Sequence, residues 1–143
     1  LDDHVAVMRE RGERALAVLT DADRPFAQAL RQVLQDMVAA RDEQPDLMRA
    51  LELELSHVLP QLLKSGEEED DLAGRIAASI ASRSDCQAAD PVVAGRLVLI
   101  CCQEVTRWLV HRAPRGMAPA PYIDGLVRMC ALVAGHGRGS SRD

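Results

Sequence analysis

The stretch from Pro91 to His111 constrains the fold more than any other part of the chain, because it predicts one long helix with a wide apolar surface. Asp90 can accept hydrogen bonds from the first turn, and Pro91 has a backbone angle already suited to a helix. Pro114 and Gly116 then end the helix. Its apolar side chains cover roughly 220° of the helix circumference, whereas packing on one core needs an arc of about 100° or somewhat more.

An apolar arc of this width has two explanations. The helix can pack on its own core with one side and on a second subunit with the other, or it can be the central helix of a monomeric bundle. The first explanation is favoured, and it predicts a homodimer. A membrane span is not expected, because polar and charged side chains share one side of the helix: Arg96, Gln103, Glu104, Arg107 and His111.

The rest of the chain predicts further helices and no strand. The sequence is 48% hydrophobic but only 2% aromatic, so its core is built from Leu, Val, Ala, Met and Ile, and the abundance of Ala favours helices. Apolar residues recur at helical spacing in segments 2–19, 24–42, 47–62, 66–83, 91–111 and 119–135. We therefore expect an all-α bundle of about six helices in a single domain over residues 1–143, with 136–143 as a disordered tail.

Charge and cysteine usage narrow the class of protein. The net charge is −5 and no basic cluster is present, so this segment is not itself a nucleic-acid surface. The sequence contains no signal peptide pattern. No two of the four cysteines, Cys86, Cys101, Cys102 and Cys130, have Cys-x-x-Cys spacing, which indicates reduced, mostly buried thiols in a cytoplasmic protein.

Residue patterns for catalysis or metal binding are weak. Glu54 and His57 form a Glu-x-x-His pair, but a di-iron site needs a second such pair, and both residues fall on the polar face of their segment. His4, His111 and His136 are isolated, with no cysteine at zinc spacing. Phosphate-binding loops and catalytic triads are not found either. The sequence therefore predicts no enzyme, no metal site and no cofactor.

One polar stripe allows two interpretations. Glu104, Arg107 and His111 are spaced so that Arg107 can reach both of the others on one helix. The stripe can be an exposed row of ion pairs, or it can be the polar wall of a ligand cavity or interface.

The order of the predicted helices and turns resembles the C-terminal domain of the tetracycline-repressor (TetR) family. In that family a long helix is followed by a short turn with proline and glycine and by a final amphipathic helix. The matching segments are EVTRWLVHRAPRG (104–116) and YIDGLVRMC (122–130), and QPDLMRAL (44–51) is similar to the junction after the family's first two helices of this domain.

The resemblance implies a ligand-responsive transcriptional regulator, expected to be a repressor. In the family, an N-terminal helix-turn-helix domain binds operator DNA, and the C-terminal domain dimerises and binds a small effector. The helix-turn-helix segment is absent from this sequence, so DNA binding is expected only of a parent protein, in which residues 2–19 would join the two domains. The last two helices of each subunit would form a four-helix bundle, with an interface made by Leu99, Cys102, Leu109, Val110, Leu126, Met129 and Val133.

An effector pocket is expected between the helices at 24–42, 66–83 and 91–111. Small residues of the segment 72–81 fill little volume, and few aromatic side chains are available to close the gap. The lining would be largely apolar and would suit a small, largely apolar effector: Phe26, Met37, Ile76, Cys101, Val105 and Trp108. A helical scaffold, or a metal or small-molecule binding protein with no role at DNA, is the alternative.

Overall fold

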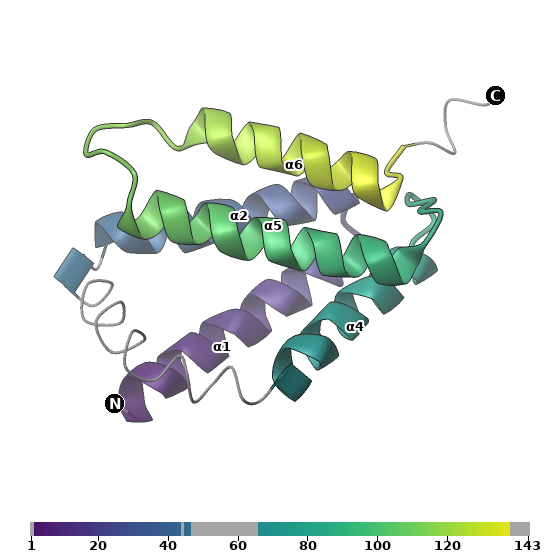
Figure 1. The fold of residues 1–143 in the computed structure, drawn as a ribbon, viewed down its shortest axis with the longest axis horizontal. Helices are drawn as coiled ribbons and strands as arrows, with labels where there is room; N and C mark the ends of the chain where they lie inside the picture. Colours follow the sequence, from purple (N-terminus) through teal and green to yellow (C-terminus); the bar gives the residue numbers. More distant parts are fainter. Residues whose placement is uncertain (1, 44, 47–65, 138–143) are drawn as a thin grey trace.

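The computed structural model describes residues 2–43, 45–46 and 66–137, and it confirms the all-α prediction for these ranges (Figure 1). The helices are α1 (Asp2–Leu19), α2 (Phe26–Glu43), α4 (Gly66–Ser82), α5 (Pro91–His111) and α6 (Ala120–Ala134). Their boundaries differ from the predicted ones by at most two residues. The helix predicted over 47–62 lies outside the described residues. The described residues form no strand, and their single β-bridge joins Cys86 to His136.

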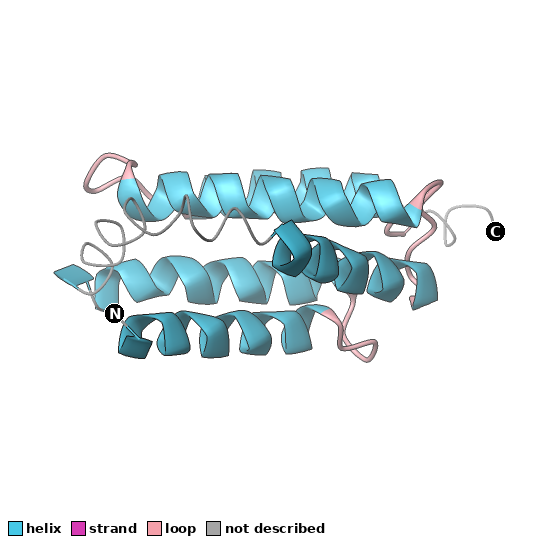
Figure 2. Ribbon diagram, turned by 60° about the horizontal axis from the view of Figure 1, so that its bottom comes forward, coloured by secondary structure: helices cyan, strands magenta, loops and turns pink. Residues whose placement is uncertain are grey.

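The long helix α5 is the centre of the bundle. It packs against α4, α6 and α2, and α1 and α2 lie side by side on the far side of the core (Figures 1 and 2). Burying a large aliphatic or aromatic side chain contributes about 1.5–3 kcal/mol. The largest fully buried side chains come from α2, α4 and α5: Phe26, Leu30, Leu34, Ile80, Val98 and Leu109.

The start of α5 follows the sequence signal closely. The carboxylate of Asp90 accepts hydrogen bonds from the backbone N–H groups of Val92 (3.1 Å) and Val93 (3.3 Å), and Pro91 occupies the first turn. These bonds satisfy two of the N–H groups that a helix start leaves without partners.

Close packing of α4 on α5 explains the small residues of α4. A Cβ atom at Gly95 would lie 2.7 Å from the backbone nitrogen of Ala77 and 2.8 Å from its Cα. Ala73 and Ala77 are both buried. At this crossing the small side chains let the two helices approach each other closely.

The end of α6 corrects the expected start of the disordered tail. Gly135 ends the helix with φ +70°, a left-handed conformation that glycine adopts without strain. The backbone then pairs with the α4–α5 loop: Gln87 N–H donates to Gly135 C=O (3.0 Å), and Gly137 N–H donates to Asp85 C=O (3.0 Å). His136 and Gly137 are therefore ordered, because the loop after α4 supplies their hydrogen-bond partners. Residues 138–143 lie outside the described part.

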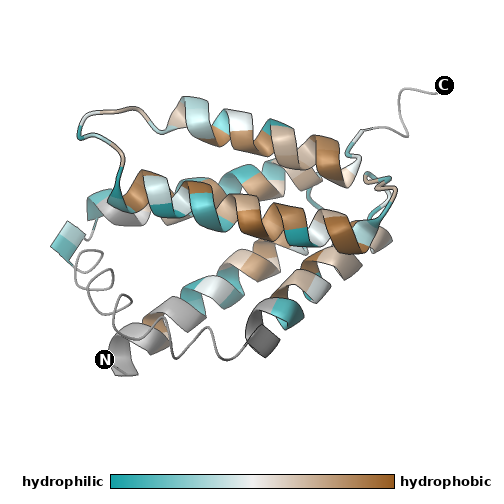
Figure 3. Cartoon of the chain, in the orientation of Figure 1, coloured by the Kyte–Doolittle hydropathy of each residue, from teal (hydrophilic) through white to brown (hydrophobic). Residues whose placement is uncertain are grey.

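Apolar residues gather in the first half of α5 and the second half of α6 (Figure 3). No helix in the described part of the chain is long and apolar enough to cross a membrane.

Candidate functional site

Two regions of the described structure stand out, and the first is an exposed apolar surface on α5 and α6. The two helices run antiparallel, so the start of α5 lies beside the end of α6 (Figure 1). We call this surface the outer face; it consists of Val93, Leu97, Ile100, Tyr122, Met129, Leu132 and Val133. These side chains are between 39% and 72% exposed. Large exposed apolar patches of this kind mark interaction sites in soluble proteins.

The structure sorts the residues predicted for the dimer interface into three groups. Met129 and Val133 belong to the outer face, and Cys102 and Val110 are half-buried. The other three are buried in the subunit's own core: Leu99, Leu109 and Leu126. The helical arcs alone did not show which part faces the chain's own core, because that depends on where α2, α4 and α6 pack around α5.

Sequence reasoning missed part of the outer face. Ile100 and Leu132 were not named for the interface, although their side chains are 46% and 72% exposed. The available signal was the combination of a large apolar side chain with a position opposite the buried residues of the same helix.

The residues predicted for the effector pocket do not surround one described cavity. Phe26 and Ile76 are core residues, and Met37 is 41% exposed, so it points away from the core. Trp108 packs against the core and against Tyr122 of α6, with the two ring centroids 5.1 Å apart.

The other two predicted lining residues, Cys101 and Val105, are half-buried on α5 and pack against the core. Two surface cavities are described, one between α2 and α6 and one beside the α4–α5 loop, and none of the six predicted residues lines either of them.

The Glu104–Arg107 stripe is on the surface. Arg107 Nη1 lies 3.2 Å from Glu104 Oε1, and both side chains are at least half exposed. This geometry fits the exposed row of ion pairs and not the wall of a cavity.

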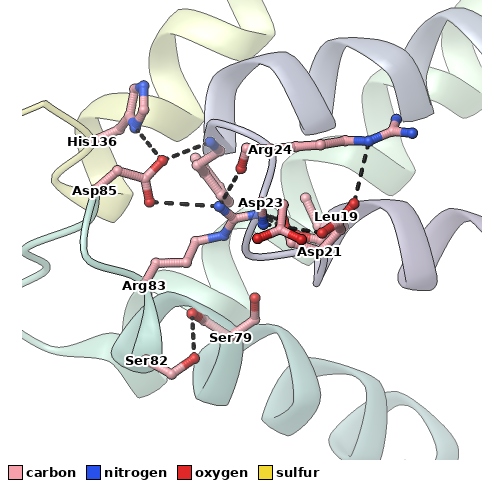
Figure 4. A network of polar contacts seen from close by, with 10 residues as sticks. Leu19, Asp21, Asp23, Arg24, Ser79, Ser82, Arg83, Asp85 and His136 are labelled. Carbon is pink, nitrogen blue, oxygen red and sulfur yellow. Dashed lines mark hydrogen bonds and ion pairs between the residues drawn. The ribbon is translucent and has the colours of Figure 1, made fainter.

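The second region is a buried polar cluster between the α1–α2 turn, the α4–α5 loop and the end of α6 (Figure 4). We call it the polar junction; its side chains are Arg83, Asp85, Cys86 and His136. The Arg83 side chain is only 2% exposed. Its Nη2 donates to the carbonyl oxygens of Leu19 (2.9 Å) and Asp21 (2.8 Å), and its Nη1 donates to that of Arg24 (2.6 Å). The guanidinium thus caps the C-terminal end of α1, where a positive charge is favourable.

Asp85 joins three segments through its carboxylate. Its Oδ2 accepts a hydrogen bond from Phe26 N–H (2.8 Å) at the start of α2, and its Oδ1 lies 3.5 Å from Arg83 Nη1. Burial tends to raise the pKa of Asp85, but the Phe26 N–H bond and the charges of Arg83 and His136 outweigh it, so the pKa is lowered. The carboxylate is therefore ionised near neutral pH.

The cysteines of this chain are free thiols. Burial and the neighbouring Asp85 raise the pKa of Cys86 to about 12, so Cys86 is not an activated nucleophile. Between α5 and α6, a hydrogen bond to Cys130 raises the pKa of the Cys102 thiol, and the same bond lowers the pKa of Cys130. The cysteines thus take part in packing, as the sequence predicted.

Comparison with known proteins assigns the family. A family model described as "Tetracyclin repressor-like, C-terminal domain" matches residues 25–131, which is more than half of the chain. No curated protein and no solved structure matches this chain. The matched range runs from just before α2 almost to the end of α6, and it includes both helices of the outer face. The chain therefore belongs to the tetracycline-repressor (TetR)-like C-terminal domain family.

Proposed function

We propose that this chain is the dimerisation and effector-binding part of a ligand-responsive transcriptional repressor that acts in the cytoplasm. Family membership supports the class of regulator. The outer face is the observation that supports dimerisation, because seven large apolar side chains on two adjacent helices are between 39% and 72% exposed in the described chain. Covering such a surface with a second copy removes apolar area from water, at roughly 25 cal/mol per Å².

A two-fold axis suits the shape of the outer face. In a symmetric dimer the same surface of each subunit forms both sides of the contact, so α5 and α6 of two subunits make a four-helix bundle. Gly125 lies on α6 between Tyr122 and Met129, and nothing lies within 4 Å of the position its Cβ would occupy. A partner helix can therefore approach the α6 backbone closely at this point.

The polar junction provides a route for the signal. Arg83 directly follows the last residue of α4 and binds the carbonyl oxygens at the end of α1. A small apolar effector that shifts α4 would thereby shift the end of α1, the helix expected to lead to the DNA-binding domain. The effector acts only through a difference in affinity between the two arrangements. Its cavity between α2, α4 and α5 stays a prediction, as does operator binding through the parent protein's N-terminal domain.

Sedimentation of the purified chain tests the dimer. We expect a dimer at tens of micromolar, and we expect Leu132→Asp to raise the dissociation constant by at least about 100-fold, because each dimer would bury two unpaired carboxylates. Gln28→Asp is the matched control, since Gln28 is exposed on α2, away from the outer face, and should leave the dimer unchanged. A monomeric wild-type chain, or equal effects of the two substitutions, would contradict the proposal.

A further inference from the structure

The polar junction brings together three side chains that commonly bind transition metals. Asp85 and Cys86 are adjacent in the α4–α5 loop, and His136 follows α6, fifty residues after Cys86. One ligand atom from each of them lies within 4.8 Å of the other two. Tetrahedral zinc sites have metal–ligand bonds of about 2.0–2.3 Å, so only small side-chain movements are needed to place all three around one ion.

The backbone around these residues is held in place. Cys86 and His136 form the antiparallel bridge, and Gln87 N–H and Gly137 N–H hydrogen bond across the same pair of segments at 3.0 Å each. The ligand positions therefore do not depend on the free rotation of a loop. Preorganised ligands lose little conformational entropy when a metal binds.

His136 supplies an independent indication. Its Nδ1 atom is buried, points into the cluster and lies 3.2 Å from Asp85 Oδ2, although no hydrogen bond joins the two atoms (Figure 4). The ring nitrogen and the carboxylate oxygen therefore already face each other, and an ion placed beside Cys86 could coordinate both.

The chemistry of the donor set selects the metal. A thiolate sulfur and an imidazole nitrogen are poor ligands for Mg²⁺ and Ca²⁺, which prefer oxygen. Zn²⁺ accepts sulfur, nitrogen and carboxylate oxygen together, and three protein ligands leave a fourth position for water. We infer that Asp85, Cys86 and His136 form a binding site for a Zn²⁺ ion.

Charge and protons balance in this site. Zn²⁺ replaces the proton of the Cys86 thiol, which leaves to solvent, and forms a Zn–S bond. The two negative ligands neutralise the ion, and Arg83 keeps its bonds to the carbonyl oxygens at the end of α1. Asp85 can keep its bond from Phe26 N–H, because each carboxylate oxygen has two lone pairs.

A path to the site is present. A surface cavity of about 480 Å³ is lined by Asp85 and His136 together with residues of the α1–α2 turn, among them Asp23. The fourth coordination position can face this cavity and take water or an external ligand. The site uses none of the outer-face side chains, although His136 closely follows Leu132 and Val133 of that face. Zinc binding can therefore be measured independently of the proposed dimer.

Calorimetric titration of the chelator-treated chain with ZnCl₂ tests the assignment, with CoCl₂ as the spectroscopic probe. We expect one Zn²⁺ per chain and a cobalt spectrum with a thiolate-to-metal charge-transfer band. Cys86→Ser should abolish that band, and His136→Gln should weaken zinc binding at least about 100-fold, since loss of an outer partner alone costs 10–100-fold.

Matched controls separate this site from other thiols and imidazoles. Cys101→Ser and His111→Gln change the same residue types outside the cluster and should leave the stoichiometry, the affinity and the cobalt band unchanged. Circular dichroism establishes that each variant is folded. The inference is overturned if the wild-type chain shows no thiolate band with cobalt, a result that needs no variant. It is also overturned if folded Cys86→Ser and His136→Gln bind zinc like the wild type.

Discussion

The polar junction and the outer face differ in where their groups find partners. In the polar junction the buried guanidinium of Arg83 is surrounded by carbonyl oxygens and a carboxylate of its own chain. On the outer face Leu132 is 72% exposed, and the described chain places nothing over it. A buried charge without partners and a large exposed apolar surface are both unfavourable. The chain supplies its own partners for the Arg83 guanidinium, but its described residues leave Leu132 uncovered.

This difference distinguishes the folding stability of one subunit from the stability of the dimer. Substitutions in the polar junction should act on the folding of one subunit, because every partner is intramolecular. Substitutions on the outer face should act on association and leave the folding of one subunit nearly unchanged. The following predictions test that separation.

Arg83→Met should have the largest effect. It leaves the carbonyl oxygens of Leu19, Asp21 and Arg24 without their donor and the Asp85 carboxylate without its arginine partner, which together cost about 3–5 kcal/mol of the free energy of unfolding. Urea unfolding followed by circular dichroism measures this change.

Arg75→Met is the control for the loss of an arginine. Arg75 is exposed and lies 3.4 Å from Glu13, so its removal should cost no more than about 1 kcal/mol. Similar losses for Arg83→Met and Arg75→Met would mean that the buried bonds of the polar junction do not stabilise the fold.

Gly135→Ala should come next. Its φ of +70° is unfavourable for alanine by about 1–2 kcal/mol, and the added Cβ would lie 2.3 Å from the carbonyl oxygen of Gln87. Gly137 has a similar φ of +79°, but no other atom lies within 4 Å of the position that an added Cβ would occupy. The Gly137→Ala substitution therefore measures the cost of the left-handed backbone conformation alone. Thermal unfolding should therefore show a larger loss for Gly135→Ala. Equal losses of stability would show that the α4–α5 loop can move away from the added Cβ with no loss of free energy.

Arg107→Gln should have the smallest effect. The Arg107–Glu104 pair is exposed, and its removal should change the free energy of unfolding by less than about 0.5 kcal/mol. The measurement is urea unfolding at low protein concentration, where one subunit is observed. An effect above 1 kcal/mol on the dimer alone, seen by sedimentation, would extend the outer face to the second half of α5.

The sequence predicted most of the described helices because their signals are local. Apolar periodicity, the Asp90–Pro91 start of α5 and its end before Pro114 act within a few residues of the chain, and the structure reproduces them. The family resemblance also rested on the order of helices and turns, and the family match confirms it.

Only the tertiary structure decided which side of each helix meets which neighbour. The apolar arc of α5 was visible in the sequence, but the burial of Leu109 and the exposure of Ile100 depend on how α2, α4 and α6 pack around it. The polar junction had no sequence signal, because Asp85 and His136 are brought together by the fold across fifty-one residues. Local sequence determines helices through hydrogen bonds between near neighbours, whereas the meeting of distant side chains depends on the packing of whole helices.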